Sequence, residues 1–319
     1  MRLLRDEGLA TAAVLHGTGL DATALDSPAC RTSVDQLLQA CRNAIELSPD
    51  PTLALRAGGR SRLSDRGMTG LLLGACDSAR DYAAQAVRYQ SLATPLLGLA
   101  VDGAAWILHE DAIELPDDLR VFLVALSTAQ QLAHLRDALG TDCRPAQARF
   151  AHAAPPHAPA YERALGCPCV FDAERHELRF ADDVLALRPR QANPIALALL
   201  RAGCDTELAE FAQRQGYGGR VARALARLRD PGASMKAVAT LLHLSDRTLR
   251  RRLAEEGTSF TEVAGEVQRR IATRELRCAG ARIEDVAANS GYSDAANFRR
   301  AFIRWTSMSP AQYRRMRQR

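Results

Sequence analysis

The 319-residue chain has no apolar stretch of about 18 residues, the length that a membrane-spanning helix needs. Its first residues, Met1–Glu7, carry acidic side chains and lack the long apolar run and small-residue cleavage site of a signal peptide. Both absences predict a cytoplasmic protein that makes no membrane contact. The length is sufficient for about two domains.

The cysteines exclude a recognisable metal site. The sequence has eight, and only Cys167 and Cys169 lie close together. No second pair stands at the spacing of metal ligands, so we expect no zinc site. We interpret the cysteines as mostly buried, reduced thiols; a redox switch at Cys167 and Cys169 is the alternative.

The signatures of common enzymes are also missing. There is no Gly-x-Ser-x-Gly, no Walker lysine loop and no His-Glu-x-x-His. The histidines are spread along the chain, and Asp117-Asp118 and Asp182-Asp183 are typical of a helix start and a turn. Trp106 and Tyr89 are interpreted as core residues, with a role in lining a pocket as the alternative. We therefore expect no enzymatic activity, no cofactor and no metal.

Charge is distributed unevenly along the chain. Residues 220–319 contain 21 basic and 10 acidic residues, a net charge of +11, whereas residues 1–219 have a net charge of −6. A basic segment joined to an acidic body favours a polyanionic partner for the basic end.

The hydrophobic pattern predicts an α+β fold. Amphipathic helices are expected over Ser33–Ile45 and Asp77–Tyr89, and a long helix over Asp117–Leu139, ending before Gly140. Asp102-Gly103 splits two short apolar runs and predicts a β-hairpin. The expected strands of a small antiparallel sheet are Leu96–Val101, Ala104–His109, Ala148–His152, Cys169–Asp172 and Glu177–Phe180.

Three regions follow from these patterns. Residues 1–187 are predicted to form an α+β domain of helices and a small sheet. Residues 188–218, with Pro189 and Pro194, are predicted to be a linker. Residues 219–319 show only helical patterns and are predicted to form an all-α domain.

The all-α region contains a repeat. The first copy spans Met235–Leu253 and the second Ile283–Phe302, with one residue inserted in the second turn. Each copy has a short helix with Val-Ala, a tight turn, and a second helix with apolar anchors four residues apart. This pattern is typical of a helix-turn-helix unit. The residues expected in the two cores are Val238, Ala239, Leu249, Leu253, Val286, Ala287, Phe298 and Phe302.

The turns and caps of the two copies can also be predicted. Ser245 and Ser293 are expected to cap the second helix of each unit. His243 stands where the second copy has Gly291, so the first turn is expected to be less regular. One long helix over Phe260–Cys278 separates the copies, and its 19 residues would span roughly 28 Å, near one turn of DNA.

The second helix of each unit is expected to enter a major groove with the face opposite its anchors. Arginine can pair with guanine and asparagine with adenine. The candidate base-contacting residues are Arg247, Arg250, Arg251, Asn297, Arg299 and Arg300. Arg251 and Arg300 match across the repeat, so we favour them for base contact. Phosphate contacts or solvent exposure are expected for Arg252, Arg270, Arg304 and Arg315.

Residues Val221–Arg319 resemble the AraC/XylS family of transcription regulators. The most specific match comprises Gly291-Tyr-Ser-Asp294, Asn297–Phe302 and Met308–Arg314, including the helix start Ser309-Pro310. The resemblance implies base contacts from Arg247, Arg250, Arg251 and Arg300. Ala295 departs from the polar residue common in relatives, which weakens base reading by the front of that helix.

The segment Leu3–Leu187 resembles the arabinose-binding-like sensor domain of a subset of this family. The matching residues are Met68–Gly74, Tyr89, Phe150–His152, Tyr161 and Gly166–Phe171. The resemblance implies a small-molecule effector, whose identity it does not give, and a homodimer. The leading hypothesis is a ligand-responsive transcription activator that binds double-stranded DNA and contacts RNA polymerase.

Two other functions are weighed against this hypothesis. A DNA-repair methyltransferase with an accessory DNA-binding unit would need a reactive cysteine in a Pro-Cys-His-Arg context, which is missing here. An architectural DNA-binding protein that senses no effector would not need a body of about 200 residues.

Overall fold

The computed structural model describes residues 9–23, 25, 30, 32–93, 97–109, 115–140, 143–214, 216–228, 230–276 and 281–317. Three predictions above involve Met1–Glu7, Leu96 and Cys278, which lie outside these residues. The chain forms two compact units, Met1–Thr206 and Glu207–Arg319. Helix α10 (Pro194–Arg214) crosses the boundary and occupies most of the segment predicted as a linker.

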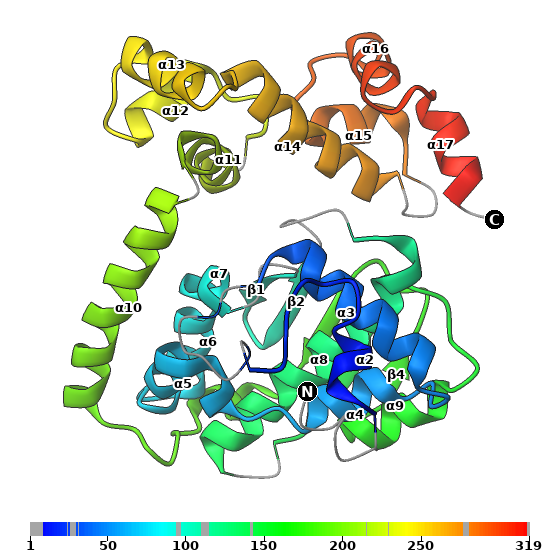
Figure 1. Cartoon of the computed structure of the whole chain (residues 1–319), viewed down its shortest axis with the longest axis vertical. Helices are drawn as coiled ribbons and strands as arrows, with labels where there is room; N and C mark the ends of the chain where they lie inside the picture. The colour runs from blue at the N-terminus through cyan, green and yellow to red at the C-terminus, as the bar shows by residue number, and fades with distance from the viewer. Residues whose placement is uncertain are drawn as a thin grey trace. The chain divides into compact units, whose positions relative to one another are not determined.

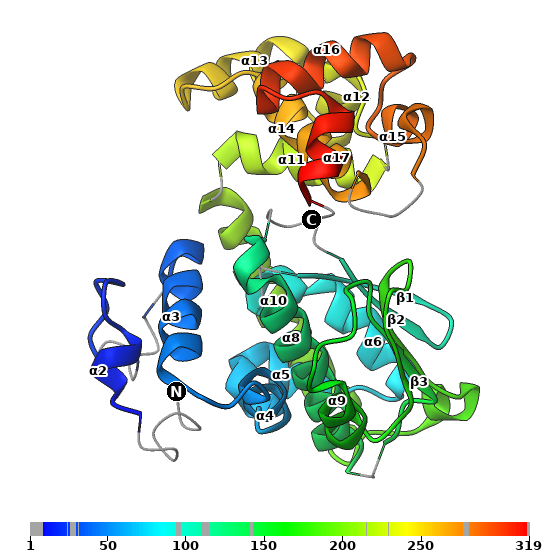
Figure 2. The same ribbon diagram turned by 90° about the vertical axis from the view of Figure 1, so that its right-hand side faces the viewer.

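The first unit is α+β, as predicted. Helix α8 (Asp117–Leu139) has the predicted bounds, and Gly140 ends it with a φ of 60°. It runs through the middle of the unit (Figures 1 and 2). The other helices are α2 (Thr11–Val14), α3 (Val34–Leu47), α4 (Leu53–Gly59), η2 (Leu63–Arg66), α5 (Gly67–Gly74), α6 (Ala79–Arg88), α7 (Gln90–Ala93), α9 (Ala158–Leu165) and η3 (Asp182–Ala186).

Close packing and capping fix these helices. Helix α4 approaches α8 so tightly that a Cβ atom on Gly58 would lie 2.4 Å from the carbonyl oxygen of Leu126. Helix α3 begins with a capping box, in which Ser33 accepts from the backbone N–H of Gln36 at 3.2 Å. The core of the unit therefore lies around α8.

The sheet is mixed, which corrects the prediction of an antiparallel sheet. Its order is β1-β2-β5-β3-β4, and β3 and β4 pair in parallel. The predicted hairpin is present, with Asp102 opposite Ala105 and Gly103 at a φ of 57°. The strands are β1 (Gly98–Asp102), β2 (Ala105–His109), β3 (Gln147–Arg149), β4 (Cys169–Val170) and β5 (His176–Arg179).

Two strands are shorter than predicted. Strand β3 ends at Arg149 rather than His152, and β4 ends at Val170 rather than Asp172. Asp172 has a φ of 53°, a left-handed conformation that no extended strand contains. The apolar runs therefore continue beyond the strands into loops that fill the core.

Every regular element described in the second unit is a helix. Helix α14 runs from the side of α12 and α13 to the side of α15 and α16 (Figure 1). The helices are α11 (Gly216–Leu228), α12 (Met235–Leu241), α13 (Asp246–Glu255), α14 (Phe260–Glu275), α15 (Ile283–Asn289), α16 (Ala295–Thr306) and α17 (Pro310–Arg317).

Helix α14 is shorter than predicted, with 16 residues that span about 24 Å. It ends at Glu275, and the next residue, Leu276, is buried in the second core. Its start is fixed by a capping box, in which Ser259 N–H donates to Glu262 at 2.8 Å and Ser259 Oγ accepts from Glu262 N–H at 3.2 Å.

Candidate nucleic-acid interface

Two separate hydrophobic cores hold the repeat together. The first joins α11, α12, α13 and the start of α14, and the second joins the end of α14 with α15, α16 and α17. The eight predicted core residues are all buried. Ala239 and Ala287 let the two helices of each unit approach closely. Leu249 and Leu253, and likewise Phe298 and Phe302, anchor α13 and α16 by one face.

The two turns have the same backbone shape, although one contains histidine and the other glycine. His243 has a φ of 55° and Gly291 a φ of 82°. In both turns the next backbone N–H reaches back five residues, from Leu244 to Ala239 and from Tyr292 to Ala287, at 2.9 Å each. The expectation that the first turn would be less regular is therefore wrong, because His243 adopts the left-handed conformation.

The helix caps differ from the prediction in one unit. Ser245 caps α13 by accepting from Thr248 N–H at 3.2 Å, as predicted. Helix α16 is capped by Asp294, not Ser293, and Asp294 accepts from Asn297 N–H at 2.7 Å. The residue inserted in the second turn moves the cap one position along the chain.

The candidate base-contacting side chains are exposed on α13 and α16. Arg247, Arg250 and Arg251 extend from α13, and Asn297, Arg299 and Arg300 from α16. Arg247 and Arg250 have no ion-pair partner among the described residues. The folding of each unit thus leaves an arginine-rich face opposite its buried anchors.

Carboxylates hold several of these arginines. Glu255 pairs with Arg251 at 3.1 Å and with Arg252 at 3.2 Å. Glu284 lies 3.9 Å from Arg299. Sequence reasoning overlooked both glutamates, although Arg251 and Glu255 stand at i, i+4 spacing, where oppositely charged side chains meet. In the structure these arginines are therefore paired with carboxylates.

A chain of polar contacts orders the start of α16. The side-chain amide of Asn297 donates to the carboxylate of Asp294. The Asn297 carbonyl oxygen accepts from Arg300 Nη2 at 2.5 Å. Hydrogen bonds from Asn297, led by its backbone N–H, lower the pKa of Asp294. Asn297 therefore aims Arg300, and both ends of its amide are engaged in the unbound protein.

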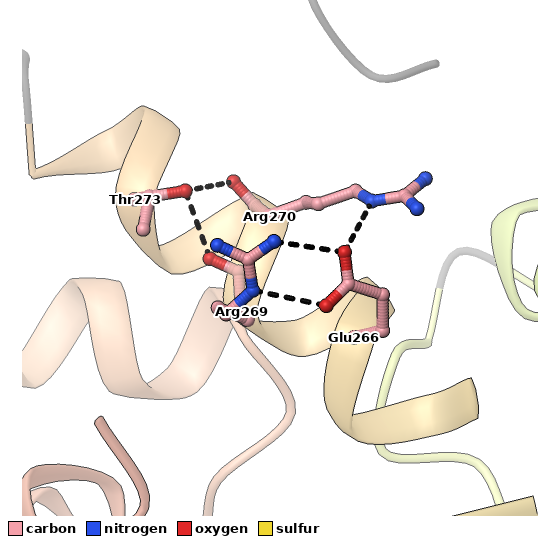
Figure 3. A network of polar contacts seen from close by, with 4 residues as sticks. All are labelled: Glu266, Arg269, Arg270 and Thr273. Carbon is pink, nitrogen blue, oxygen red and sulfur yellow. Dashed lines mark hydrogen bonds and ion pairs between the residues drawn. The ribbon is translucent and has the colours of Figure 1, made fainter. Parts of the chain in front are cut away.

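The four candidate phosphate contacts lie in different surroundings. Arg252 also lies over the ring of Tyr217, 5.6 Å from its centroid. Arg304 on α16 and Arg315 on α17 are exposed. Arg270 belongs to a network on α14 (Figure 3).

In that network Glu266 accepts from Arg269 Nε at 2.9 Å and from Arg270 Nε at 3.0 Å. Its pKa is lowered, chiefly by the hydrogen bond from Arg269. Thr273 donates to the backbone carbonyls of both arginines. The sequence analysis did not single out Arg269, whose side chain is 26% exposed, against 34% for Arg270.

In the first unit, Trp106 and Tyr89 are buried in the core. Trp106 stacks on Tyr82 with 5.8 Å between ring centroids, and the Tyr89 hydroxyl donates to Asp205 at 2.6 Å. Arg66 Nε, the Tyr82 hydroxyl and Trp106 Nε1 are among the buried polar atoms that have no hydrogen-bond partner in the described part of the chain. Burial raises the pKa of Tyr82, and the nearby charge of Arg66 opposes this shift.

Cys167 and Cys169 are neighbours in space. Cys167 is buried and Cys169 is half-buried. A hydrogen bond from Cys169 lowers the pKa of Cys167 and raises that of Cys169. Both are free thiols. No group of three or more possible metal ligands is found in the described parts of the chain, and none of the described helices is long and apolar enough to cross a membrane.

Comparison with known families matches both units. Residues 8–189 match the arabinose-binding domain found at the N-terminus of AraC transcription regulators, and residues 238–316 match a helix-turn-helix domain. The chain belongs to the AraC family of transcription regulators. As in other proteins of this family, its helix-turn-helix domain binds DNA.

Similar AraC-family proteins span nearly the whole chain. An HTH-type transcriptional regulator of Mycobacterium tuberculosis is 30% identical, over 97% of this chain and 92% of that protein. The ornithine utilization regulator of Pseudomonas aeruginosa is 28% identical, over 98% of this chain and 93% of that protein. The solved structure of the transcriptional regulator CdpR from Pseudomonas aeruginosa is 26% identical, with a TM-score of 0.43 over 86% of this chain and 91% of that chain. The Mycobacterium tuberculosis and ornithine utilization proteins are regulators, not enzymes, which agrees with the prediction and disfavours the methyltransferase alternative.

Proposed function

We propose that this AraC-family regulator is a ligand-responsive transcription activator that binds two successive major grooves with α13 and α16. In this proposal residues 1–187 sense an effector, residues 188–218 link the domains, and residues 219–319 bind DNA. The observation that carries the DNA-binding mode is the pair of exposed arginine faces on two helices joined by one α14 of about 24 Å. Successive major grooves on one face of DNA lie about 34 Å apart, which two units on such a strut can reach.

We assign base contacts mainly to Arg251 and Arg300. The other candidates for base contacts are Arg247, Arg250, Arg299 and Asn297. Arg300 is aimed by Asn297, and Arg251 is restrained by Glu255. Phosphate binding is assigned to Arg252, Arg270, Arg304 and Arg315. An arginine that reads a base contributes mostly to specific affinity, whereas one on phosphate contributes equally on all sequences.

The test is binding of the purified chain to its own upstream DNA and to random duplex, over a salt series. Specific recognition predicts affinity for the upstream DNA at least about 1,000-fold higher at physiological salt. Equal affinity for both DNAs would refute a sequence-specific regulator. Transcription from that DNA with purified RNA polymerase, with and without the regulator, then separates activation from repression.

The effector is proposed to bind inside the first unit. Buried polar groups are normally hydrogen-bonded, so the unpaired donors of Arg66, Tyr82 and Trp106 favour a small ligand that accepts hydrogen bonds. The guanidinium of Arg66 favours a carboxylate or another anion. A thermal-shift screen should then stabilise the wild type with anionic metabolites, and Tyr82→Phe should weaken that effect. A screen without hits would favour an architectural protein that senses no effector.

A homodimer is proposed through the first unit. Ile195 and Leu199 on α10 are 73% and 71% exposed, and Leu71 on α5 is 55% exposed. Gly203 of α10 lies against Met68 of α5, so the two helices that carry these side chains are in contact. Exposed apolar patches of this kind are typical of protein interfaces. Light scattering should show a dimer for the wild type and a monomer for Ile195→Glu; a monomeric wild type would refute this part.

A further inference from the structure

The two helix-turn-helix units touch directly at two glycines. Gly232 lies in the loop before α12, and Gly291 lies in the turn between α15 and α16. A Cβ atom on Gly232 would lie 2.6 Å from the carbonyl oxygen of Gly291, and one on Gly291 would lie 2.3 Å from the nitrogen of Gly232. Heavy atoms in van der Waals contact are about 3.5 Å apart or more, so a side chain at either position must push the two backbones apart.

Gln268 on α14 binds both sides of this contact. Its Nε2 donates to the carbonyl oxygen of Pro231 at 3.1 Å, and its Oε1 accepts from the Tyr292 hydroxyl at 3.1 Å. Pro231 precedes Gly232, and Tyr292 follows Gly291. One side chain in the middle of α14 therefore joins the loop of the first unit to the turn of the second.

Each side of the contact is fixed within its own unit. Asp230 Oδ1 accepts from Gly232 N–H at 2.9 Å, which shapes the loop. The Tyr292 ring meets the rings of Phe298 and Trp305 edge-on, with centroids 5.8 and 6.0 Å away, which ties the turn to α16. A displacement at the glycines would therefore be transmitted to the recognition helix.

We propose that Gly232, Gly291 and Gln268 form a clasp that fixes the distance and rotation between α13 and α16, and with them the permitted spacing of the two DNA half-sites. Without the clasp, α14 would carry the connection between the two units, and a single helix can bend. This inference rests on the proposed binding of two successive grooves.

The expected consequence is strict spacing. One base pair inserted between the half-sites moves the second by about 3.4 Å and turns it by about 35° around the DNA axis. Units held by the clasp cannot follow that rotation, so α16 can no longer enter the second major groove. Units released from the clasp can follow it in part.

The experiment starts with selection of binding sites from a randomised duplex pool by the full-length chain. Affinity is then measured on the selected duplex, on the same duplex with one inserted base pair, and on a duplex with the second half-site scrambled. For the wild type, insertion should lower affinity about 30-fold or more, as much as scrambling does. For Gly232→Ala, affinity for the selected duplex should fall and the insertion penalty should shrink to about 5-fold or less.

Gly265→Ala is the matched control. Gly265 lies on α14, and a Cβ atom there would meet only Trp305 Nε1 at 3.7 Å, an ordinary contact. This variant should keep the wild-type insertion penalty. Gln268→Ala and Tyr292→Phe remove the bridge without adding atoms, and both should reduce the penalty even if Gly232→Ala does not fold.

Affinity for an isolated first half-site checks the folding of every variant and should equal that of the wild type. Suppose that Gly232→Ala, Gln268→Ala and Tyr292→Phe all bind the half-site normally and lose as much affinity on insertion as the wild type does. That result would refute the clasp and leave the two-groove proposal standing. A wild type that binds the isolated half-site as tightly as the full site would refute the two-groove proposal, and the clasp with it.

Discussion

Arg251 and Arg252 are adjacent on α13, yet they should respond differently to replacement by alanine. Both pair with Glu255, at 3.1 and 3.2 Å, and both are exposed. Arg251 matches Arg300 in the second unit and is assigned to a base, whereas Arg252 is assigned to phosphate. The pair is therefore an internal control, since either substitution removes one arginine and one contact to the same glutamate.

The structure sets the size of each effect. An exposed i, i+4 ion pair contributes about 0.3–0.5 kcal/mol, and arginine N-terminal to glutamate is the weaker order. Either substitution should thus change the free energy of unfolding by less than about 0.5 kcal/mol. Loss of a bidentate contact to a base costs about 1–3 kcal/mol, or roughly 5- to 150-fold in affinity. The DNA contact therefore outweighs the ion pair that Arg251 gives up.

Arg251→Ala should weaken binding to the cognate duplex by that factor and change binding to random duplex little. Arg252→Ala should weaken both equally and reduce the slope of log affinity against log salt by about 0.9. Fluorescence anisotropy with both duplexes over a salt series measures these quantities. If the two variants lose the same factor on both DNAs, Arg251 does not read a base, and specificity must come from the other candidate residues on α13 and α16 or from DNA shape.

Three further predictions follow from the same contacts. Glu255→Gln releases Arg251 and Arg252, so binding to random DNA should tighten and its salt slope should steepen by up to about 1–2; an unchanged slope would mean that Glu255 does not restrain them. Phe302→Ala opens a cavity among Phe298, Trp305 and Tyr313, so calorimetry should show a free energy of unfolding lower by about 3–5 kcal/mol. Arg304→Ala replaces an exposed side chain and should leave the free energy of unfolding almost unchanged; equal losses in the two variants would contradict this packing. Burial lowers the pKa of His134 to about 4, so the neutral form is favoured in the folded state, and stability present above about pH 6.5 should be lost as the pH falls toward 4. His134→Gln should reduce this fall in melting temperature, and His157→Gln should not. If His134→Gln shows the same fall as the wild type, other titratable groups cause the loss of stability.

Much of this molecule is encoded locally and could be predicted from the sequence. The repeat, its Val-Ala helices and its four-residue anchor spacing define both units, because helical periodicity and burial act within a few residues. Helix α8 has its predicted bounds, since Gly140 supplies the left-handed residue that ends a helix. The capping box of Ser259 and Glu262 is likewise a short-range pattern.

The tertiary structure decided what depends on residues far apart in the chain. The parallel pairing of β3 with β4 joins Ala148 to Cys169 across a helix, and no local pattern distinguishes it from an antiparallel pair. Gly232 and Gly291 are in contact although they lie far apart in the sequence, so no local pattern predicts this contact. Gln268 bridges the two sides only because the folded chain places α14 beside both. The sequence thus determined which helices exist and which faces they bury, because those follow from neighbours along the chain. How two such units are held at one spacing was decided by packing, because only folding brings the loop of one against the turn of the other.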